Sequence, residues 1–421
     1  MRSAEVRALG ELAGSAVSGF ARFIQETHQG IAGRPFNALG VAALPVRAIH
    51  DTVARAAYRT VGTALGAPPR VAAAAVARLA PPGSRALADS LRGSIALGAL
   101  NGAIGDALTS GRSKLALAMT IRERGRDVPI RAEELALAYP DAGGRLAVFL
   151  HGLCETDESW RVLPLVRDAG YRGSYGSRLR QDLGYTPVYV RYNTGLHISD
   201  NGLRLSDLLE ELVEKWPAAV AEIALVGHSM GGLVARSACH HGELAGAGWT
   251  GALRHVFCLG SPHLGTPLEK AANVAGFALG RLPETSGLAR IVNGRSAGIK
   301  DLRFGSCVEA DWCDCDPDEF LRDRCHEVPF VDSTAYYFVG ATLARDADGL
   351  AGSAIGDLLV RFSSASGRGR SRRIPFEIEN GRHVGGINHF QLLNHPAVYE
   401  QIRSWLSRPP RQGAAVAALE T

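Results

Sequence analysis

The sequence predicts an α/β protein with a mostly parallel central sheet flanked by helices. After residue 143, short apolar runs typical of buried strands alternate with helical patterns. Before it, alanine-rich helical patterns dominate, and residues 266–331 form a stretch far longer than an ordinary strand–helix connection. We therefore expect a helical N-terminal region at 1–142, an α/β domain at 143–410 with a lid-like insertion at about 266–331, and a flexible tail at 411–421.

The N-terminal region is expected to hold several helices. From Glu5 to His28, apolar residues return at helical spacing, which predicts an amphipathic helix. Further helical patterns cover residues 47–66, 69–79 and 85–109. Because proline lacks the amide hydrogen that a helix interior needs, we expect helices to end at Pro68-Pro69 and at Pro81-Pro82-Gly83.

The sheet is expected to begin with the apolar run Leu146–Leu150. Later strands are predicted at Val188–Val190, Ile223–Val226, His255–Leu259, Tyr336–Val339 and Ile374–Ile378. Helical patterns cover 203–215 and the segment from Ser229 to about His241. Such alternation predicts right-handed crossovers between parallel strands.

Composition and charge argue against nucleic-acid binding. Apolar residues make up 46% and charged residues 21% of the chain, which is a globular balance. The formal charge of +4 comes from scattered arginines and not from a basic stripe with interleaved aromatic residues. The densest basic run is interpreted as a solvated hairpin tip and consists of Arg368, Arg370, Arg372 and Arg373.

The expected location is cytoplasmic, with peripheral membrane contact as an option. The N-terminus lacks the basic start, apolar core and cleavage site of a secretory signal. The most apolar window, about Ala86–Leu108, contains Asp89, Arg92 and Asp106, whereas a spanning helix needs about 20 nearly uncharged residues. Seven cysteines, an odd number, suit a reducing compartment better than a disulfide framework.

The clearest chemical signal is Gly227-His228-Ser229-Met230-Gly231, which lies between an apolar strand and a helix. A serine on such a sharp turn projects from the end of the sheet, and glycines flank it because a β-carbon there would collide with neighbouring backbone. The helix N-terminus also favours developing negative charge. We expect Ser229 to be the nucleophile of an acyl-transfer reaction.

Acyl transfer also needs donors aimed at the oxyanion that develops on the attacked carbonyl. His151-Gly152-Leu153 follows the first strand of the sheet directly and supplies a loop for this purpose. We expect the backbone amides of Leu153 and Met230 to form the oxyanion hole.

These segments resemble bacterial lipases and esterases of the α/β-hydrolase superfamily, especially PGAP1-like hydrolases. The resemblance covers about residues 145–408. It rests on Phe149–Leu153, Arg191–Gly195, the turn at Ser229, Gly260–Pro267 and the region around His389. It implies an α/β-hydrolase fold and the chain order nucleophile, acid, histidine, with the acid after a late strand.

Three aspartates follow the predicted strand Tyr336–Val339: Asp346, Asp348 and Asp357. Asp357 is favoured, because Leu358-Leu359-Val360 after it resembles the turn that follows the acid in lipases. Asp348 is the alternative, since Asp348-Gly349-Leu350 is similar but lacks the valine. Either aspartate could instead cap a turn.

His389 lies in the loop before the last helix, where the family carries its catalytic histidine. Its neutral imidazole would take the Ser229 proton and return one to the leaving group, with Asp357 fixing the tautomer. His383 is interpreted as a surface residue and His395 as a helix cap.

Other reactive side chains receive structural interpretations. His228 and His263 are expected to support the turn and the end of the sheet. The insertion contains four cysteines and a histidine: Cys307, Cys313, Cys315, Cys325 and His326. Their spacing fits no paired Cys-x-x-Cys zinc site, so ordinary side chains are favoured over a disulfide or zinc. We expect neither a metal nor a cofactor.

The predicted function is hydrolysis of a small-molecule or lipid ester through an acyl-enzyme on Ser229. The insertion is expected to roof the pocket, which favours medium or long acyl chains. Two alternatives remain: an acyltransferase with the same triad, and a non-catalytic scaffold that docks on a membrane or a partner. The oligomeric state stays open.

Overall fold

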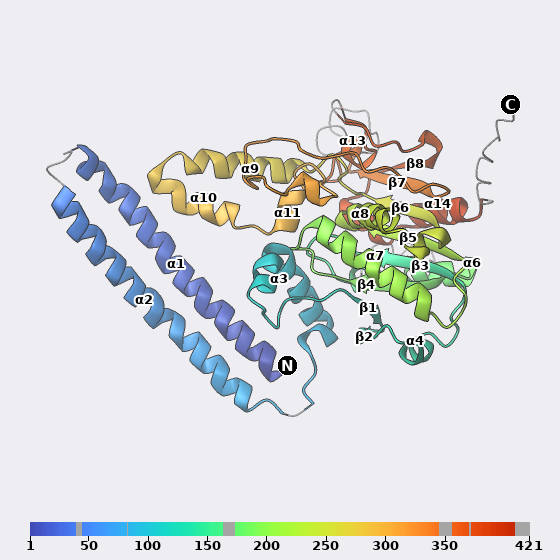
Figure 1. The fold of residues 1–421 in the computed structure, drawn as a ribbon, viewed down its shortest axis with the longest axis horizontal. Coiled ribbons are helices and arrows are strands. Elements are labelled where there is room, and N and C mark those ends of the chain that lie inside the picture. The colour runs from blue at the N-terminus through green and yellow to red at the C-terminus, as the bar shows by residue number, and fades with distance from the viewer. Residues whose placement is uncertain (39–43, 82, 163–172, 345–355, 370–371, 409–421) are drawn as a thin grey trace.

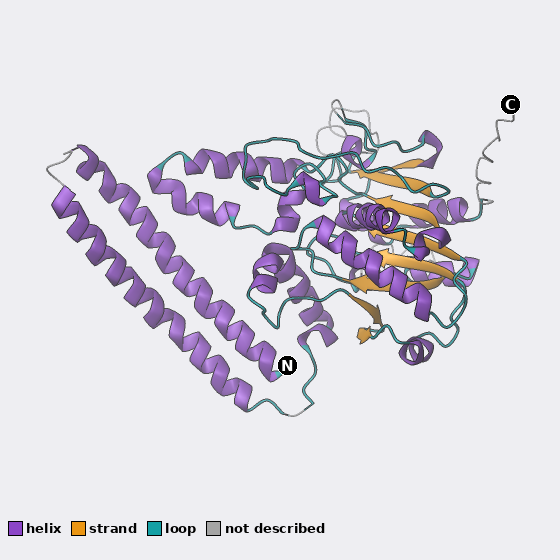
Figure 2. Ribbon diagram, viewed as in Figure 1, coloured by secondary structure: helices purple, strands orange, loops and turns teal. Residues whose placement is uncertain are grey.

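The computed structural model describes residues 1–38, 44–81, 83–162, 173–344, 356–369 and 372–408. It consists of an α/β body and a long helical hairpin that stands beside it (Figures 1 and 2). The body has the α/β-hydrolase-like architecture expected from the sequence: a mostly parallel sheet with helices on both faces.

Within the described residues, the sheet has eight strands in the order β2-β1-β4-β3-β5-β6-β7-β8. The strands from β4 to β8 in this order are parallel, whereas β1 is antiparallel to both β4 and β2. Their bounds are β1 (Thr120–Glu123), β2 (Arg126–Val128), β3 (Arg145–Leu150), β4 (Thr186–Arg191), β5 (Glu222–His228), β6 (Leu253–Leu259), β7 (Ala335–Thr342) and β8 (Gly381–Gly385). Leu150 at the end of β3 pairs with Val190 on β4 and Gly227 on β5, so the loops after these strands meet at one end of the sheet.

Helices cover the sheet and form the hairpin. The α-helices are α1 (Ser3–Ala38), α2 (Leu44–Arg78), α3 (Leu91–Ser110), α4 (Ala132–Ala138), α5 (Ser159–Val162), α6 (Tyr175–Leu183), α7 (Ile198–Lys215), α8 (Met230–Ala245), α9 (Pro267–Gly280), α10 (Ser286–Asn293), α11 (Ala297–Asp301), α13 (Phe362–Ala365) and α14 (Pro396–Leu406). Short 3₁₀ helices are η2 (Leu87–Asp89), η3 (Gly248–Ala252), η4 (Pro283–Thr285), η5 (Glu309–Asp311), η6 (Ile378–Asn380) and η7 (His389–Leu393). No helix in this described part is long and apolar enough to cross a bilayer.

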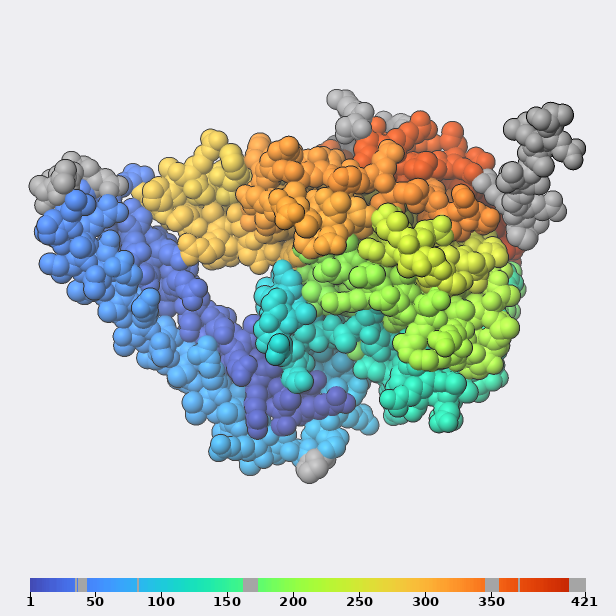
Figure 3. Space-filling view, viewed as in Figure 1, coloured from blue at the N-terminus to red at the C-terminus, as the bar shows by residue number. Residues whose placement is uncertain are grey.

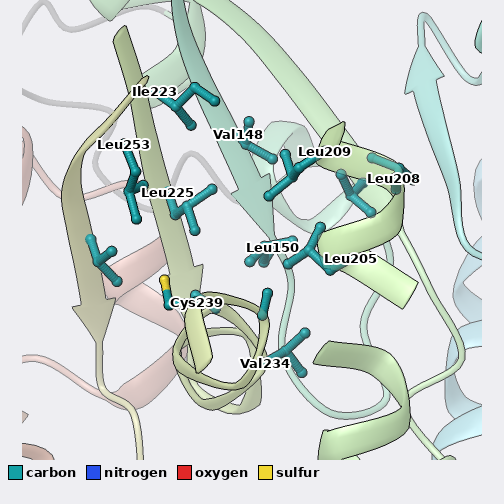
Figure 4. Packing of buried hydrophobic residues seen from close by; sticks show 14 of the residues in the cluster. Val148, Leu150, Leu205, Leu208, Leu209, Ile223, Leu225, Val234, Cys239 and Leu253 are labelled. Atoms are coloured by element: carbon teal, nitrogen blue, oxygen red, sulfur yellow. The ribbon is translucent and has the colours of Figure 1, made fainter. Parts of the chain in front are cut away.

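Alternate side chains of the strands fill two cores, one on each face of the sheet. On one face, Val148, Leu150 and Leu225 meet Leu205 of α7 and other apolar residues of α7 and α8 (Figure 4). On the other face, the strands pack against α6 and α14. Because both faces are buried, these strands read as continuous apolar runs in the sequence.

The helix break expected at Pro68-Pro69 was wrong, because α2 continues through both prolines. Close packing against α1 supports this helix where its own hydrogen bonds are missing. A β-carbon added at Gly66 would lie 2.5 Å from Ser18 Oγ and 2.7 Å from the Gly14 carbonyl oxygen. Glycines therefore bring the two backbones together beside the prolines.

The strand expected at Ile374–Ile378 was also wrong, since the strand beside β7 is β8. Ile374 and Phe376 are buried, but Phe376 packs against aromatic rings, including that of Phe338. Gly381, at the start of β8, pairs with Phe338, and a β-carbon there would lie 2.3 Å from the Phe338 ring. The apolar run at residues 374–378 therefore reflects buried side chains and not a strand of the sheet.

Two strands of the sheet, β1 and β2, come from residues placed in the expected helical region, so the sheet begins before residue 143. Arg122 on β1 is buried and donates to Asp127 Oδ1 at 2.7 Å. The sequence pattern missed these short strands because charged residues interrupt their apolar positions.

The arginine run only partly fits the expected hairpin tip. Arg368 and Arg373 form an antiparallel bridge, whereas Arg370 lies outside the described residues. Arg372 is not freely solvated, because it donates to the carbonyl oxygens of His263, at 2.8 Å, and Phe304.

Candidate active site

Ser229 lies on a strained turn between β5 and α8. Its φ of 53° and ψ of −120° are costly for a residue with a β-carbon. The Ser229 amide donates to the Leu259 carbonyl oxygen at 2.8 Å, which helps to hold this conformation. Added β-carbons at Gly227 and Gly231 would each lie 2.4 Å from backbone atoms. The flanking glycines therefore allow the turn, for the steric reason expected from the sequence.

Asp357 and His389 lie together at the same end of the sheet. His389 Nδ1 donates to Asp357 Oδ2 over 2.7 Å, and both side chains are almost fully buried. The other carboxylate oxygen, Oδ1, accepts the amides of Leu359 at 3.1 Å and Val360 at 2.8 Å. The turn that favoured Asp357 in the sequence thus fixes the orientation of this carboxylate.

The second ring nitrogen of His389, Nε2, is buried and has no hydrogen-bond partner among the described residues. With Nδ1 committed to Asp357, Nε2 carries the lone pair that can accept a proton. Ser229 and His389 line the same pocket, although no hydrogen bond joins their side chains in the described structure. Such contacts are often long without substrate and tighten only during the reaction.

Among the described residues, His383 and His395 do not line this pocket. Asp346 and Asp348 lie outside the described residues. His383, on β8, is only half-buried and contacts Thr342 Oγ1 at 2.7 Å. His395 caps α14, because its Nδ1 accepts the Ala397 amide at 3.2 Å, as the sequence indicated.

The loop after β3 lies beside the nucleophile. A β-carbon at Gly152 would lie 3.1 Å from the Ser229 β-carbon, and Leu153 lines the same pocket as Ser229. The Gly152 amide is already used, because it donates to Glu155 Oε2 at 2.7 Å. Neither the Leu153 nor the Met230 amide donates a hydrogen bond within the described part of the chain, so both are available to an oxyanion.

The segment Arg191–Gly195, which begins at the last residue of β4, supports this loop through hydrogen bonds. The Tyr192 amide donates to His151 Nε2 at 3.2 Å, and its hydroxyl donates to the His151 carbonyl oxygen at 2.5 Å. His151 Nε2 is therefore an acceptor, and burial lowers the pKa of this imidazole. Thr194 Oγ1 accepts the Cys154 amide at 3.2 Å. The segment Arg191–Gly195 thus holds the loop that follows β3 in place.

Glu155 is a residue that the sequence reasoning missed. Its side chain is only 9% exposed, and Oε2 lies 3.1 Å from His228 Nδ1. His228 Nε2 lies 3.2 Å from the carbonyl oxygen of His389. Both ring nitrogens of His228 therefore face oxygen atoms, an arrangement that a doubly protonated, cationic imidazole beside an ionised Glu155 satisfies.

The pKa values of Glu155 and His228 shift in the directions expected for an ion pair, downward for the acid and upward for the histidine. Burial opposes charge on both groups, but the facing carboxylate raises the pKa of His228 above its ordinary value of 6.5. Burial would likewise raise the pKa of Glu155, but the His228 cation and the Gly152 amide lower it below 4.5. The sequence signal for this pair was an acid three residues after Gly152 and a histidine directly before Ser229.

A pocket of about 200 Å³ opens at Ser229 and His389. The insertion contributes Thr266, Leu268, Glu269, Ala272, Arg295, Ile299 and Leu302 to its wall. The rest of the lining includes the apolar residues Leu153, Leu359, Val360 and Phe390. Glu269 is 3% exposed and ion-paired with Arg295 at 2.7 Å and Arg303 at 3.0 Å, which joins α9 to the segment around α11. The wall is thus mainly apolar, and a buried ion-pair network holds its elements together.

His263 and the seven cysteines do not belong to the lining of this pocket. His263 is fully buried; its Nδ1 lies 3.2 Å from Arg236 Nη1, and burial together with nearby arginines holds its pKa well below the ordinary value. All seven cysteines are free thiols, including Cys307, Cys313, Cys315 and Cys325 of the insertion. The described residues contain no group of three or more His, Cys, Asp or Glu side chains placed to hold a metal.

Comparisons with known proteins agree with the fold. Residues 141–280 match the family described as PGAP1-like alpha/beta domain. No curated protein matches the chain.

The chain is also similar, at low identity, to several solved structures of bacterial proteins. Mature lipase BlEst2 of Bacillus licheniformis is 19% identical, with a TM-score of 0.39, over 62% of this chain and 91% of its own. RedJ thioesterase of Streptomyces coelicolor is 19% identical, with a TM-score of 0.34, over 63% and 91%. EstA of Clostridium botulinum is 13% identical, with a TM-score of 0.36, over 64% and 88%. At these identities and scores, the likeness says nothing about the substrate.

Proposed function

We propose that this chain, whose residues 141–280 match the PGAP1-like α/β domain family, is a serine hydrolase that cleaves carboxylic esters through an acyl-enzyme on Ser229. The observation that carries the proposal is the buried hydrogen bond from His389 to Asp357, which leaves His389 Nε2 free beside the pocket of the strained Ser229 turn. A buried, oriented imidazole with an unpaired nitrogen is what a general base needs.

The first half-reaction forms the acyl-enzyme. Ser229 Oγ attacks the ester carbonyl carbon while its proton passes to His389 Nε2, and Asp357 stabilises the imidazolium through Nδ1. The amides of Leu153 and Met230 receive the developing oxyanion, and one such donor typically contributes about 3 kcal/mol. The intermediate collapses as the C–O bond breaks, and the departing alkoxide takes the proton from His389.

The second half-reaction releases the acid. Water gives a proton to His389 Nε2 and attacks the acyl carbonyl carbon, and the bond to Ser229 Oγ then breaks. His389 returns the proton to Ser229, so the enzyme is restored and one carboxylic acid leaves. Transfer of the acyl group to an alcohol would follow the same steps with that alcohol in place of water.

The pocket supports esters with an apolar acyl chain. Leu268, Ala272 and Ile299 of the insertion line the same pocket as Ser229, together with Phe390. We propose that the insertion acts as the roof of the acyl pocket and shields the acyl-enzyme from bulk water. Medium or long acyl chains bury more apolar surface there than acetate does.

A panel of p-nitrophenyl esters from acetate to palmitate, together with a fluorophosphonate probe, tests the proposal. Ser229→Ala should lose about six orders of magnitude in turnover and should not be labelled. Ser110→Ala, at an exposed serine of α3, is the matched control and should behave like the wild type. Ester cleavage or labelling that persists in folded Ser229→Ala protein would refute the proposal.

A further inference from the structure

Helix α2 has an unpartnered apolar face. It packs on α1 through small residues, and its buried positions are Ala54, Gly62, Gly66 and Ala77. Large aliphatic side chains are exposed along the rest of the helix and at the residue directly after it, with exposed fractions between 47% and 82%: Val46, Ile49, Val53, Val61, Leu65, Val71, Val76 and, after the helix, Leu79. These eight residues form the α2 outer face. Single exposed aliphatics are ordinary, but a row along a helix about 50 Å long marks a surface for binding.

The body of the protein does not cover this face, because it contacts the hairpin through α1. Phe23 and Glu26 pack against Gly287 of α10, and Glu26 pairs with Arg290. Arg34 pairs with Glu284 of η4. Figure 3 shows α1 between α2 and the helices of the insertion, with the hairpin extending as an arm. The amphipathic helix expected at 5–28 is therefore packed on the insertion, and α2 is the helix whose aliphatic side chains stay exposed.

The charge of α2 limits what can bind there. The helix carries five arginines and a single acid, Asp51. Asp51 is already engaged, since it lies 3.7 Å from Arg47 Nε and 3.1 Å from His50 Nδ1. Arg55, Arg59 and Arg78 are exposed and form no ion pair with the described residues. The helix thus combines exposed aliphatic side chains with uncompensated positive charge.

We propose that the α2 outer face docks on the surface of a bilayer that contains anionic phospholipid. An amphipathic helix with arginines beside its apolar residues inserts those residues at the headgroup boundary, while the arginines contact lipid phosphates. A second copy of the chain fits less well, because pairing two α2 faces would bring arginines together without acids to neutralise them. This proposal concerns the hairpin and does not depend on the chemistry at Ser229.

Vesicle flotation of the full chain tests the docking, with Ser229→Ala protein throughout so that binding is measured without ester cleavage. Vesicles are phosphatidylcholine alone, or phosphatidylcholine with about a third phosphatidylglycerol.

The double variant Ile49→Gln/Val53→Gln removes two aliphatic side chains of the α2 outer face, which are 67% and 63% exposed. Its control is Leu137→Gln/Leu244→Gln, at similarly exposed leucines of α4 and α8. Arg55→Gln/Arg59→Gln is matched by Arg92→Gln/Arg204→Gln, at exposed arginines of α3 and α7.

Both α2 variants should bind phosphatidylglycerol vesicles at least about tenfold more weakly, the two controls should bind like the parent protein, and added salt should weaken binding. Circular dichroism should show unchanged helix content in every variant, because all substituted side chains are exposed. Equal binding to uncharged vesicles, or undiminished binding by the α2 variants, would overturn the proposal. So would a chain that floats with neither vesicle and forms a dimer that only the α2 variants dissociate.

Discussion

Glu155 and His228 form a buried ion pair, with 3.1 Å between Oε2 and Nδ1, that joins three parts of the candidate site. Glu155 also accepts the Gly152 amide of the loop after β3. His228 precedes the nucleophile and donates through Nε2 to the carbonyl oxygen of His389. The loop after β3, the Ser229 turn and the His389 backbone are thereby held in one arrangement.

Glu155→Gln should lower kcat by about ten- to hundredfold with a smaller effect on KM, because small displacements of the reacting groups slow the chemical step strongly. The carboxamide keeps the shape but cannot neutralise His228. Glu158→Gln, at a half-buried acid outside this network, is the control and should keep kcat. Steady-state kinetics on one p-nitrophenyl ester checks the comparison, and equal kcat values for the two variants would contradict the positioning role.

The same pair should make stability depend on pH. The folded-state pKa of Glu155 is lowered, so its contribution is present above the ordinary value of 4.5 and is lost as pH falls through the folded value. The folded-state pKa of His228 is raised, so its contribution is present below 6.5 and is lost as pH rises through the folded value. The pair should therefore stabilise most between these ordinary values. Tm measured from about pH 5 to about pH 9 should fall on the alkaline side less steeply in Glu155→Gln than in wild type. Parallel curves would argue that the pair is not charged.

Asp357→Asn should lower kcat by about four orders of magnitude, because the amide cannot hold the His389 tautomer that leaves Nε2 free. Asp348→Asn, at the other aspartate favoured by the sequence, should retain most activity. Initial rates of the two purified proteins decide between them. The reverse order would move the acid to Asp348 and leave the assignment of Ser229 intact.

Ala272→Trp should shorten the acyl pocket, because Ala272 of α9 lines its wall. We expect kcat/KM for octanoate or longer esters to fall at least about tenfold while acetate cleavage changes little, since lost apolar burial acts on the longer chain. Ala271→Trp, at the exposed neighbour on the same helix, is the control. If the preference for chain length stayed unchanged, the acyl chain would not lie along α9.

Strands buried on both faces were predictable from the sequence, and so was the turn at Ser229. Parallel strands such as β3 and β5 are apolar along most of their length, and a Gly-x-Ser-x-Gly turn needs small residues for steric reasons that any chain must obey. The sequence favoured Asp357 because the turn after it resembles that of lipases, and the amides of this turn do hold its carboxylate; its role as the catalytic acid stays a prediction.

Features that depend on long-range contacts were not predictable. The buried Arg122 of β1 is compensated by Asp127 and by Asp157, which lies 3.5 Å away and far along the chain. Glu155 looks like one acid among several until folding brings His228 beside it. Helix α2 runs through two prolines only because α1 packs closely against it, which a single-helix pattern does not contain.

The position of β1 has a consequence for any shortened form of the protein. β1 pairs with β4 from Thr120 opposite Arg191 to Arg122 opposite Tyr189, so it covers the C-terminal half of that side of β4. A fragment starting at residue 143 would expose β4 as a bare edge strand and leave Arg191 without Asp127, to which it donates at 2.8 Å. Unprotected edges recruit strands from other molecules. The autonomous folding unit therefore extends upstream of residue 120, and fragments cut later should aggregate instead of reporting on catalysis.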